Sequence, residues 1–247
     1  MVQLSKRLQS VADLAGHCGT MADVGTDHGY IPVYLVSNQK AKKAIALDVN
    51  PGPLLRAREH IMQYGLEGKI EARLSDGCLA LEPGEADVIV VAGMGGALMQ
   101  RILAQGAGAA RAAKRLVLQP QSELAAFRKF LFQDGYQIMA EDMVFEDGKY
   151  YPIIVSSYQG EWPEGCGRAS LAQRHIEGQA DLTLSYKFGP LLLAQKHPVL
   201  RQFLQRQRQQ KQKILVQLQK NSKKDDTIRA AELAQELKDI DSALRFF

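Results

Sequence analysis

The chain has 247 residues, enough for one large domain or for a domain of about 150 residues with an appendage. Its hydrophobic content of 46% is typical of a globular protein with a packed core, and the longest apolar runs fall short of the roughly 18 residues that a membrane-spanning helix needs. A net charge of +4 is weak evidence for an anionic partner and excludes little by itself.

The N-terminus and the cysteines both predict a cytoplasmic protein. The first 16 residues form an amphipathic pattern without the apolar core of a signal peptide. Cys18, Cys78 and Cys166 are odd in number and far apart, so they fit neither a disulfide framework nor a zinc site. We expect free thiols in a reducing compartment, no metal and no membrane.

Helices and strands alternate through about residue 135. Helical spacing or capping signals predict helices over 4–16, 30–38, 51–64, from about 97 to 103, and 122–134, with Ser122 as a cap. Apolar or β-branched runs predict strands over 20–25, 42–50, 69–77, 86–96 and 115–121, and a hairpin of strands 136–145 and 150–158 follows. This order predicts an α/β fold, a Rossmann-like doubly wound sheet with an antiparallel edge strand.

After about residue 160 the pattern changes. A linker-like stretch at 160–170 divides a predicted first domain, 1–160, from a second, 161–247. From Pro198 two apolar stripes predict an antiparallel, coiled-coil-like helical hairpin; their residues are Leu200, Phe203, Leu204, Ile214, Leu215 and Leu218, then Leu233, Leu237, Ile240 and Leu244. We expect a monomer, with dimerisation through these helices as the alternative.

The charges of the hairpin are unevenly distributed. Residues 182–224 contain ten lysines and arginines and no acid, whereas the last helix is acidic overall. Two interpretations stay open: the helices pair their charges, or the excess of cations, interleaved with glutamines, forms a phosphate-binding surface for nucleic acid.

Acids and glycines follow four successive predicted strands. Asp23 and Gly25 end the first, Asp48 ends the second, Asp76-Gly77 ends the third, and Gly93-Met94 ends the fourth. Open α/β sheets bind ligands at this edge, so the four sites together predict a nucleotide-like cofactor more strongly than any one of them alone. Asp48 suits ribose hydroxyls, and Asp76 suits the amine of an adenine ring.

The loop at 23–30 favours a cationic cofactor. A dinucleotide loop reads G-x-G-x-x-G, whereas here Gly25 begins G-T-D-H-G and an acid precedes it. Asp23 and Asp27 beside a pyrophosphate are electrostatically costly. The sulfonium and ammonium groups of S-adenosyl-L-methionine suit such carboxylates, and this predicts a methyltransferase with a basic helical appendage.

The segments "LSKRLQSVADL", "ADVGTDHGYIPVYL", "AIALDVNPGPL", "SDG" and "VAGMGG" resemble the TrmK family, the bacterial tRNA (adenine(22)-N1)-methyltransferases. The resemblance covers the chain from about Leu4 through the hairpin. It implies S-adenosylmethionine-dependent methylation of adenine N1 in tRNA by a class I methyltransferase domain with a C-terminal coiled-coil domain. The cofactor-binding residues predicted with it are Asp23, Gly25, Thr26, Asp48, Val49, Asp76, Gly77, Gly93 and Met94.

The predicted catalytic residues are Asp27, His28 and Tyr30. We expect the Asp27 carboxylate to stabilise the positive charge that develops when adenine N1 is alkylated; alternatively it caps the next helix or binds the cofactor's ammonium group through water. His28 contacts the base or is structural, Tyr30 stacks on the base or is core, and Met94 packs or contacts substrate. The competing functions are a methyltransferase for another RNA or a small molecule, and a non-enzymatic cofactor-binding or RNA-binding protein.

Overall fold

The computed structural model describes residues 2–159, 182–221 and 224–247. Internal contacts divide the chain into two compact units, Met1–Ser170 and Leu171–Phe247. The predicted boundary at residue 160 and the linker at 160–170 lie outside the described residues, as does Cys166. Among the described helices, none is both long and apolar enough to cross a membrane.

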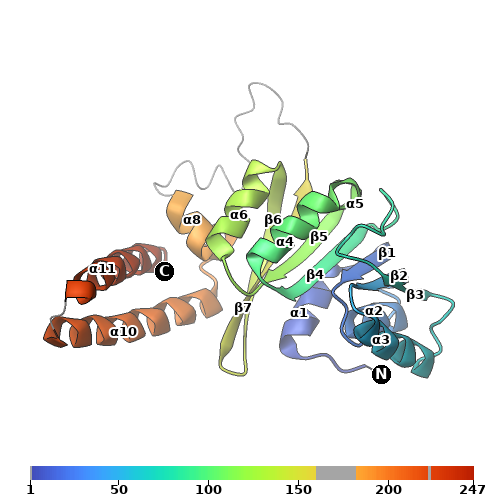
Figure 1. The fold of residues 1–247 in the computed structure, drawn as a ribbon, viewed down its shortest axis with the longest axis horizontal. Coiled ribbons are helices and arrows are strands. Elements are labelled where there is room, and N and C mark those ends of the chain that lie inside the picture. Colours follow the sequence, from blue (N-terminus) through green and yellow to red (C-terminus); the bar gives the residue numbers. More distant parts are fainter. Residues whose placement is uncertain (1, 160–181, 222–223) are drawn as a thin grey trace. The chain divides into compact units, whose positions relative to one another are not determined.

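Unit 1 is built on one sheet with the strand order β3-β2-β1-β4-β5-β7-β6 (Figure 1). The first five strands pair in parallel, and β7 runs antiparallel to both β5 and β6 at one side of the sheet, so the predicted doubly wound fold with antiparallel pairing at its edge is confirmed. The strands are β1 (Cys18–Val24), β2 (Ala41–Asp48), β3 (Ile70–Leu74), β4 (Val88–Met94), β5 (Arg115–Pro120), β6 (Tyr136–Glu146) and β7 (Lys149–Tyr158).

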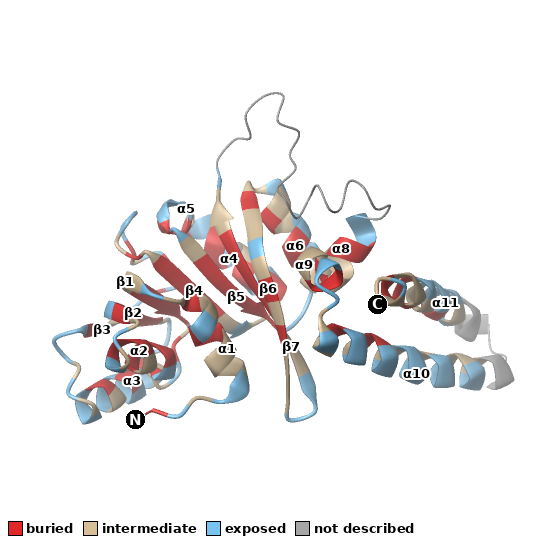
Figure 2. Ribbon diagram, turned by 180° about the vertical axis from the view of Figure 1, so that it is seen from behind, coloured by how far each residue is buried: buried red, intermediate tan, exposed pale blue. Residues whose placement is uncertain are grey.

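Helices cover both faces of this sheet and form two separate hydrophobic clusters with it. On one face lie α1 (Lys6–Ala15), α2 (Tyr30–Ser37) and α3 (Pro51–Gln63), and on the other lie α4 (Gly96–Gln105), α5 (Ala107–Ala112) and α6 (Leu124–Gln133). The residues of β4 from Val88 to Val91 are at most 3% exposed, because a strand covered on both faces is apolar without alternation (Figure 2). A rigid central sheet therefore carries the strand ends.

Two local predictions in unit 1 need correction. The helix expected to end near Leu103 continues to Gln105, and a second short helix, α5, follows it directly. Ser122 does not cap α6. The N-cap residue is Glu123, in a left-handed conformation, and its carboxylate accepts a hydrogen bond of 2.9 Å from the backbone N–H of Ala97 in the first turn of α4. Glu123 thus links the first turns of two helices at the edge where the strands end.

Unit 2 contains α8 (Leu182–Phe188), α9 (Pro190–Ala194), α10 (Pro198–Asn221) and α11 (Lys224–Leu244). The helices α10 and α11 are antiparallel, because Arg208 pairs with Asp241 while Lys211, further along α10, pairs with the earlier Glu236. The predicted hairpin is therefore confirmed. Ile214 departs from the predicted stripe and is 43% exposed, since it lies about 80° around the helix from Leu204, which is buried.

Candidate active site at the carboxyl ends of the strands

Asp23 provides a buried carboxylate at the end of β1. It is 6% exposed, and its Oδ2 accepts a hydrogen bond of 2.7 Å from the hydroxyl of Thr26, which is itself 1% exposed. Burial raises the pKa of Asp23 to about 6; the Thr26 hydrogen bond opposes this shift, and the nearby carboxylate of Asp48 adds to it. Among the described residues no lysine or arginine lies within 4 Å of Asp23 to offset its charge.

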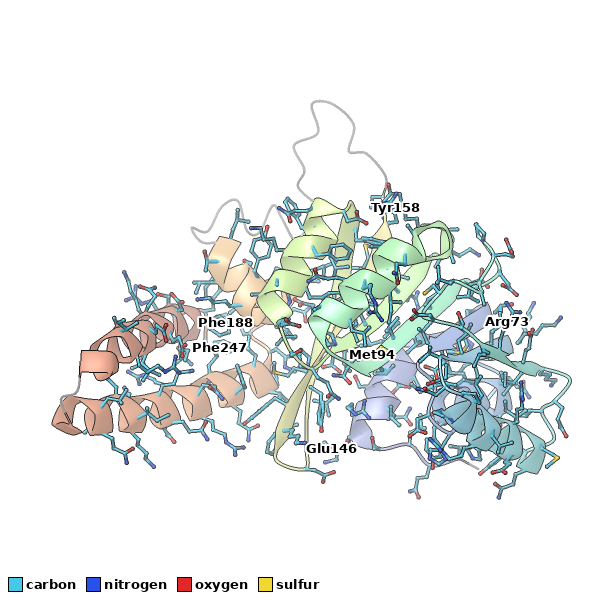
Figure 3. The ribbon with its side chains drawn as sticks, in the orientation of Figure 1. Arg73, Met94, Glu146, Tyr158, Phe188 and Phe247 are labelled. Atoms are coloured by element: carbon cyan, nitrogen blue, oxygen red, sulfur yellow. The ribbon has the colours of Figure 1, made fainter. Side chains whose placement is uncertain are left out.

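Gly25 follows in a left-handed conformation with φ +75°, and the side chain of Met94 covers it. A Cβ added to Gly25 would lie 2.0 Å from the Met94 Cε. The Met94 side chain, at the end of β4 (Figure 3), is therefore in close contact with the loop that follows β1. The N–H groups of Gly25 and Thr26 both donate to the carbonyl of Leu47 on β2, each at 2.8 Å. The loop is therefore fastened to the sheet, and these two N–H groups are already paired.

Asp48 and Asp76 lie at the ends of the next two strands. Asp48 Oδ1 accepts a hydrogen bond of 2.8 Å from the N–H of Asn50, and the Asp48 carbonyl accepts one of 2.9 Å from Ser75, which brings the two strand ends together. The side chain of Asp76 is 50% exposed, and its Oδ1 lies 3.9 Å from Arg101 Nη2. Val49 follows Asp48 directly and is 56% exposed, so it adds an apolar side chain to the surface at these strand ends.

Two glycines shape the rest of this edge through left-handed backbone. Gly77 has φ +61°, and an added Cβ would press against Ile102 at 3.0 Å. Gly93 has φ +82° and lies at a bulge between β4 and β5. A Cβ at Gly93 would lie 3.8 Å from Nη1 of Arg7, which comes from α1. The N-terminal helix therefore contributes a cation to the same edge.

The loop residue Asp27 does not cap α2, whose N-cap is Gly29 and has no side-chain hydrogen bond. Instead, Asp27 Oδ1 accepts a hydrogen bond of 2.7 Å from Arg56 Nη2 on α3, and His28 Nε2 lies 3.5 Å from the same oxygen. The Asp27 side chain is 65% exposed, so its carboxylate is accessible beside its arginine partner.

The rings of His28 and Tyr30 belong to a row of aromatic side chains beside the loop that follows β1. His28 has φ +63°, and its carbonyl lies 2.9 Å from Nδ1 of His60. The His28 and Tyr30 rings stack with centroids 5.3 Å apart, and the Tyr30 ring meets His60 edge-on at 5.1 Å. Tyr30 is 40% exposed, so it is a surface ring that is supported from behind rather than a core residue.

These residues suit a cofactor with positive charge. The carboxylates of Asp23 and Asp48 are neighbours, Asp23 is buried, and neither has a lysine or arginine within 4 Å among the described residues. A cationic ligand therefore reduces the electrostatic repulsion between them, whereas an anionic ligand increases it. Within the described ranges no group of three or more histidine, cysteine or acidic side chains is placed to hold a metal ion. The edge is thus built from carboxylates, three glycines with left-handed backbone and exposed rings.

A second candidate surface lies on the helical hairpin. A groove of about 480 Å³ is lined by arginine and glutamine side chains together with the C-terminal Phe247: Arg201, Gln205, Arg208, Gln209, Gln212, Leu244 and Phe247. Cross-helix pairing accounts for part of the basic charge, through Lys211 with Glu236 and Arg208 with Asp241. Among the described side chains, Arg201 and Lys213 have no acidic partner within 4 Å. Charge pairing between the helices is therefore confirmed in part, and the phosphate-binding surface stays a prediction.

Comparison with known proteins identifies the fold and the family. A family profile described as "Methyltransferase domain" matches residues 4–154. The tRNA (adenine(22)-N(1))-methyltransferase of Bacillus subtilis is 41% identical over 155 residues, which are 63% of this chain and 65% of that protein. The crystal structure of the B. subtilis m1A22 tRNA methyltransferase TrmK superposes with a TM-score of 0.82 and 32% identity over 99% of this chain and 100% of that one.

The chain belongs to the TrmK family of methyltransferases. The structure of M. capricolum TrmK in complex with the cofactor product S-adenosyl-homocysteine also superposes, with a TM-score of 0.76 and 25% identity over 98% of each chain. The agreement with TrmK structures extends through both units, although the sequence match with the curated B. subtilis enzyme covers slightly less than two thirds of that protein.

Several residues at the TrmK-type edge were missed by the sequence analysis. Arg56 and His60 lie on α3, about 30 residues after the loop that they support, and no spacing rule links them to it. Arg7 reaches Gln119 across 112 residues. The one available signal was that Arg7 lies in "LSKRL", a segment that carries the resemblance.

Proposed function

We propose that this protein is a tRNA methyltransferase that uses S-adenosylmethionine to methylate N1 of adenine 22. The observation that carries the proposal is the superposition on TrmK over the whole chain, together with a strand edge whose carboxylates suit a cationic cofactor. The tRNA is the partner, and we expect a cytoplasmic monomer; dimerisation through the hairpin stays the alternative.

The cofactor supplies an electrophilic methyl group from its sulfonium. We propose that Asp48 holds the ribose hydroxyls, that Asp76 and the exposed Val49 hold the adenine ring, and that Asp23 with Thr26 provides negative charge near the amino-acid portion. The left-handed backbone of Gly25, Gly77 and Gly93 shapes the loops that would surround the cofactor, and the Met94 side chain packs against Gly25. The residues that would hold the cofactor come from four adjacent strands, which keeps them rigid.

For the methyl acceptor, little activation is needed, because adenine N1 has a free lone pair at neutral pH. The enzyme must position the base and exclude water, and the exposed Tyr30 ring, supported by His28 and His60, is a surface on which an unstacked base can rest. Alkylation makes the ring cationic. We propose that the Asp27 carboxylate, which accepts a hydrogen bond from Arg56, stabilises that charge or accepts a hydrogen bond from the N6 amine.

On unit 2, we propose that Arg201 and its neighbours along the groove of α10 contact tRNA phosphates. Glutamines between the arginines suit polar contacts to the sugar–phosphate backbone, which position an RNA without reading its sequence. A surface of this kind explains why a base modification enzyme carries a basic helical unit.

The test is methyl transfer from labelled S-adenosylmethionine to an unmodified tRNA transcript, with the product nucleoside identified by mass spectrometry. The matched control is the same transcript with guanine in place of adenine 22. We expect N1-methyladenosine from the first transcript and none from the second. Another methylated nucleoside would refute the proposed position, and no incorporation into any tRNA would refute the substrate class.

A further inference from the structure

Arg7 is held in a defined position at the carboxyl ends of β4 and β5. Its Nη1 donates a hydrogen bond of 2.9 Å to Oε1 of Gln119, a residue that is 0% exposed, and its guanidinium lies over the ring of Tyr151, 5.4 Å from the centroid. Gln119 is paired with Ala92, directly before Gly93, in the β4–β5 register. A fully buried amide therefore aims the guanidinium at the strand end beside the cofactor loop.

Within residues 2–159 and the described part of unit 2, no carboxylate lies within 4 Å of the Arg7 guanidinium to pair with its positive charge. A guanidinium has five N–H donors, and Arg7 uses one of them on Gln119. The two carboxylate oxygens of Glu146 accept hydrogen bonds from the backbone N–H groups of Lys6 and Arg7, at 2.6 and 3.4 Å, so Glu146 anchors the start of α1 through its backbone. Most N–H donors of the Arg7 guanidinium therefore have no acceptor among the residues that the structure describes.

The other arginines that the structure describes in unit 1 do not share this arrangement. Five pair with acids: Arg56, Arg73, Arg101, Arg111 and Arg128. The remaining two donate to backbone carbonyls, Arg58 to Ala72 and Arg115 to Leu14 and Ala15. Arg7 thus differs from them in being oriented by a neutral buried side chain, which fixes the cation without neutralising it.

We propose that Arg7 binds an anionic pair of oxygens in the active site. The inference rests on the proposed function, which brings two such groups to this edge: the carboxylate of the amino-acid portion of S-adenosylmethionine, and a phosphate next to the target adenosine. The acids at the edge suit the sulfonium and the ammonium, whereas the carboxylate of the same zwitterion needs a cation. A guanidinium recognises carboxylate and phosphate alike through paired N–H donors.

The test compares two ligands by titration calorimetry on the whole protein and on Arg7→Gln. S-adenosylhomocysteine carries the carboxylate, and 5′-methylthioadenosine lacks the amino-acid portion altogether. If the carboxylate is the bound group, we expect the variant to bind S-adenosylhomocysteine about tenfold or more weakly and methylthioadenosine unchanged. If phosphate is the bound group, both small ligands bind normally, tRNA binds more weakly, and the slope of log Kd against log salt falls by about one.

Two further variants separate binding from structure. Arg115→Gln removes hydrogen bonds to the last turn of the same helix at the opposite end of β5, so it loosens α1 without touching the edge. Gln119→Glu gives Arg7 a carboxylate partner and should reproduce the loss of ligand affinity while leaving Arg7 in place. If Gln119→Glu does not fold, Arg7→Lys takes its place. Because lysine keeps the positive charge, Arg7→Lys should lose less ligand affinity than Arg7→Gln.

The proposal is overturned if Arg7→Gln leaves both ligand selectivity and the tRNA salt slope unchanged, or if Arg115→Gln causes the same binding loss. Thermal unfolding of each variant shows whether the helix is retained. Binding of the two small ligands does not depend on which RNA is methylated. A selective loss of S-adenosylhomocysteine binding in a protein that fails to methylate tRNA would therefore support this inference and refute the proposed substrate.

Discussion

Asp23 lowers the stability of the cofactor-free protein at neutral pH, and Asp23→Asn should remove that cost. The pKa of Asp23 is about 6 in the folded chain against 3.8 for an ordinary aspartate, so the folded state keeps a proton that the unfolded state loses between these values. A raised pKa contributes stability that is complete below pH 3.8 and is lost as pH rises through 6. The difference of about two units corresponds to about 3 kcal/mol at neutral pH.

The assay is urea unfolding of the cofactor-free wild type and of Asp23→Asn from pH 4.5 to pH 7.5. We expect the variant to gain about 2 kcal/mol relative to the wild type over this range, most of it below pH 6, because asparagine stays neutral throughout. The same variant should lose affinity for S-adenosylhomocysteine, an exchange of stability for function that is common at binding sites. Asp147→Asn, at the exposed hairpin turn, is the control for the loss of one surface carboxylate.

A stability difference between wild type and Asp23→Asn that does not change with pH would refute the reasoning. The reasoning would also be refuted if Asp23→Asn were less stable than the wild type at pH 7.5 and its free energy of unfolding changed with pH in the same way as that of the wild type. Either outcome would mean that the Asp23 carboxylate is ionised in the folded protein at low pH, and that the local environment already compensates its charge.

Four further predictions concern single residues. Gly25→Ala places a Cβ at φ +75° against Met94, so cofactor affinity should fall in calorimetry; unchanged affinity would contradict the loop geometry. Asp27→Asn should lower the turnover number about tenfold to a hundredfold with S-adenosylhomocysteine binding intact, and equal turnover would exclude a charge-stabilising role. Arg201→Gln should weaken tRNA binding and reduce its salt slope by about one, whereas an unaltered slope places the phosphate contact elsewhere. Burial raises the pKa of Cys78 to about 12, so iodoacetamide at pH 7.5 should modify it only on unfolding, and rapid labelling of the native protein would disprove this.

The strand ends were predictable because their signals are local. A buried parallel strand is a continuous apolar run, as at Val88–Val91, and the acid or glycine that interrupts the run marks its end. The topology rule for open α/β sheets then places these ends at one edge without knowledge of any contact. The antiparallel hairpin of α10 and α11 was predictable for a similar reason, since two apolar stripes joined by a polar stretch have few ways to pack.

The partners of the site residues were not predictable in the same way. Asp27 contacts Arg56, and His28 contacts His60, only when α3 packs beside α2. The sequence also allowed Asp27 as the N-cap of α2, whereas the N-cap residue is Gly29. The short helices α5, α8 and α9 are too brief for a periodic signal. Tertiary packing, not residue spacing, decides these features.

The anchoring of α1 by Glu146 has a consequence for the order of assembly. Glu146 lies 140 residues after Lys6, at the turn of the last hairpin of the sheet, and Gln119 is 112 residues from Arg7. Contacts between residues so far apart in the sequence form late in folding, because the entropy cost of closing a large loop comes before the contact contributes any stabilising energy. The helix α1 therefore docks only after β5 and the β6–β7 hairpin have formed, and Arg7 reaches the edge only when these strands are in place. A chain truncated before β7 would hold the cofactor loop in its sequence and still lack a finished site.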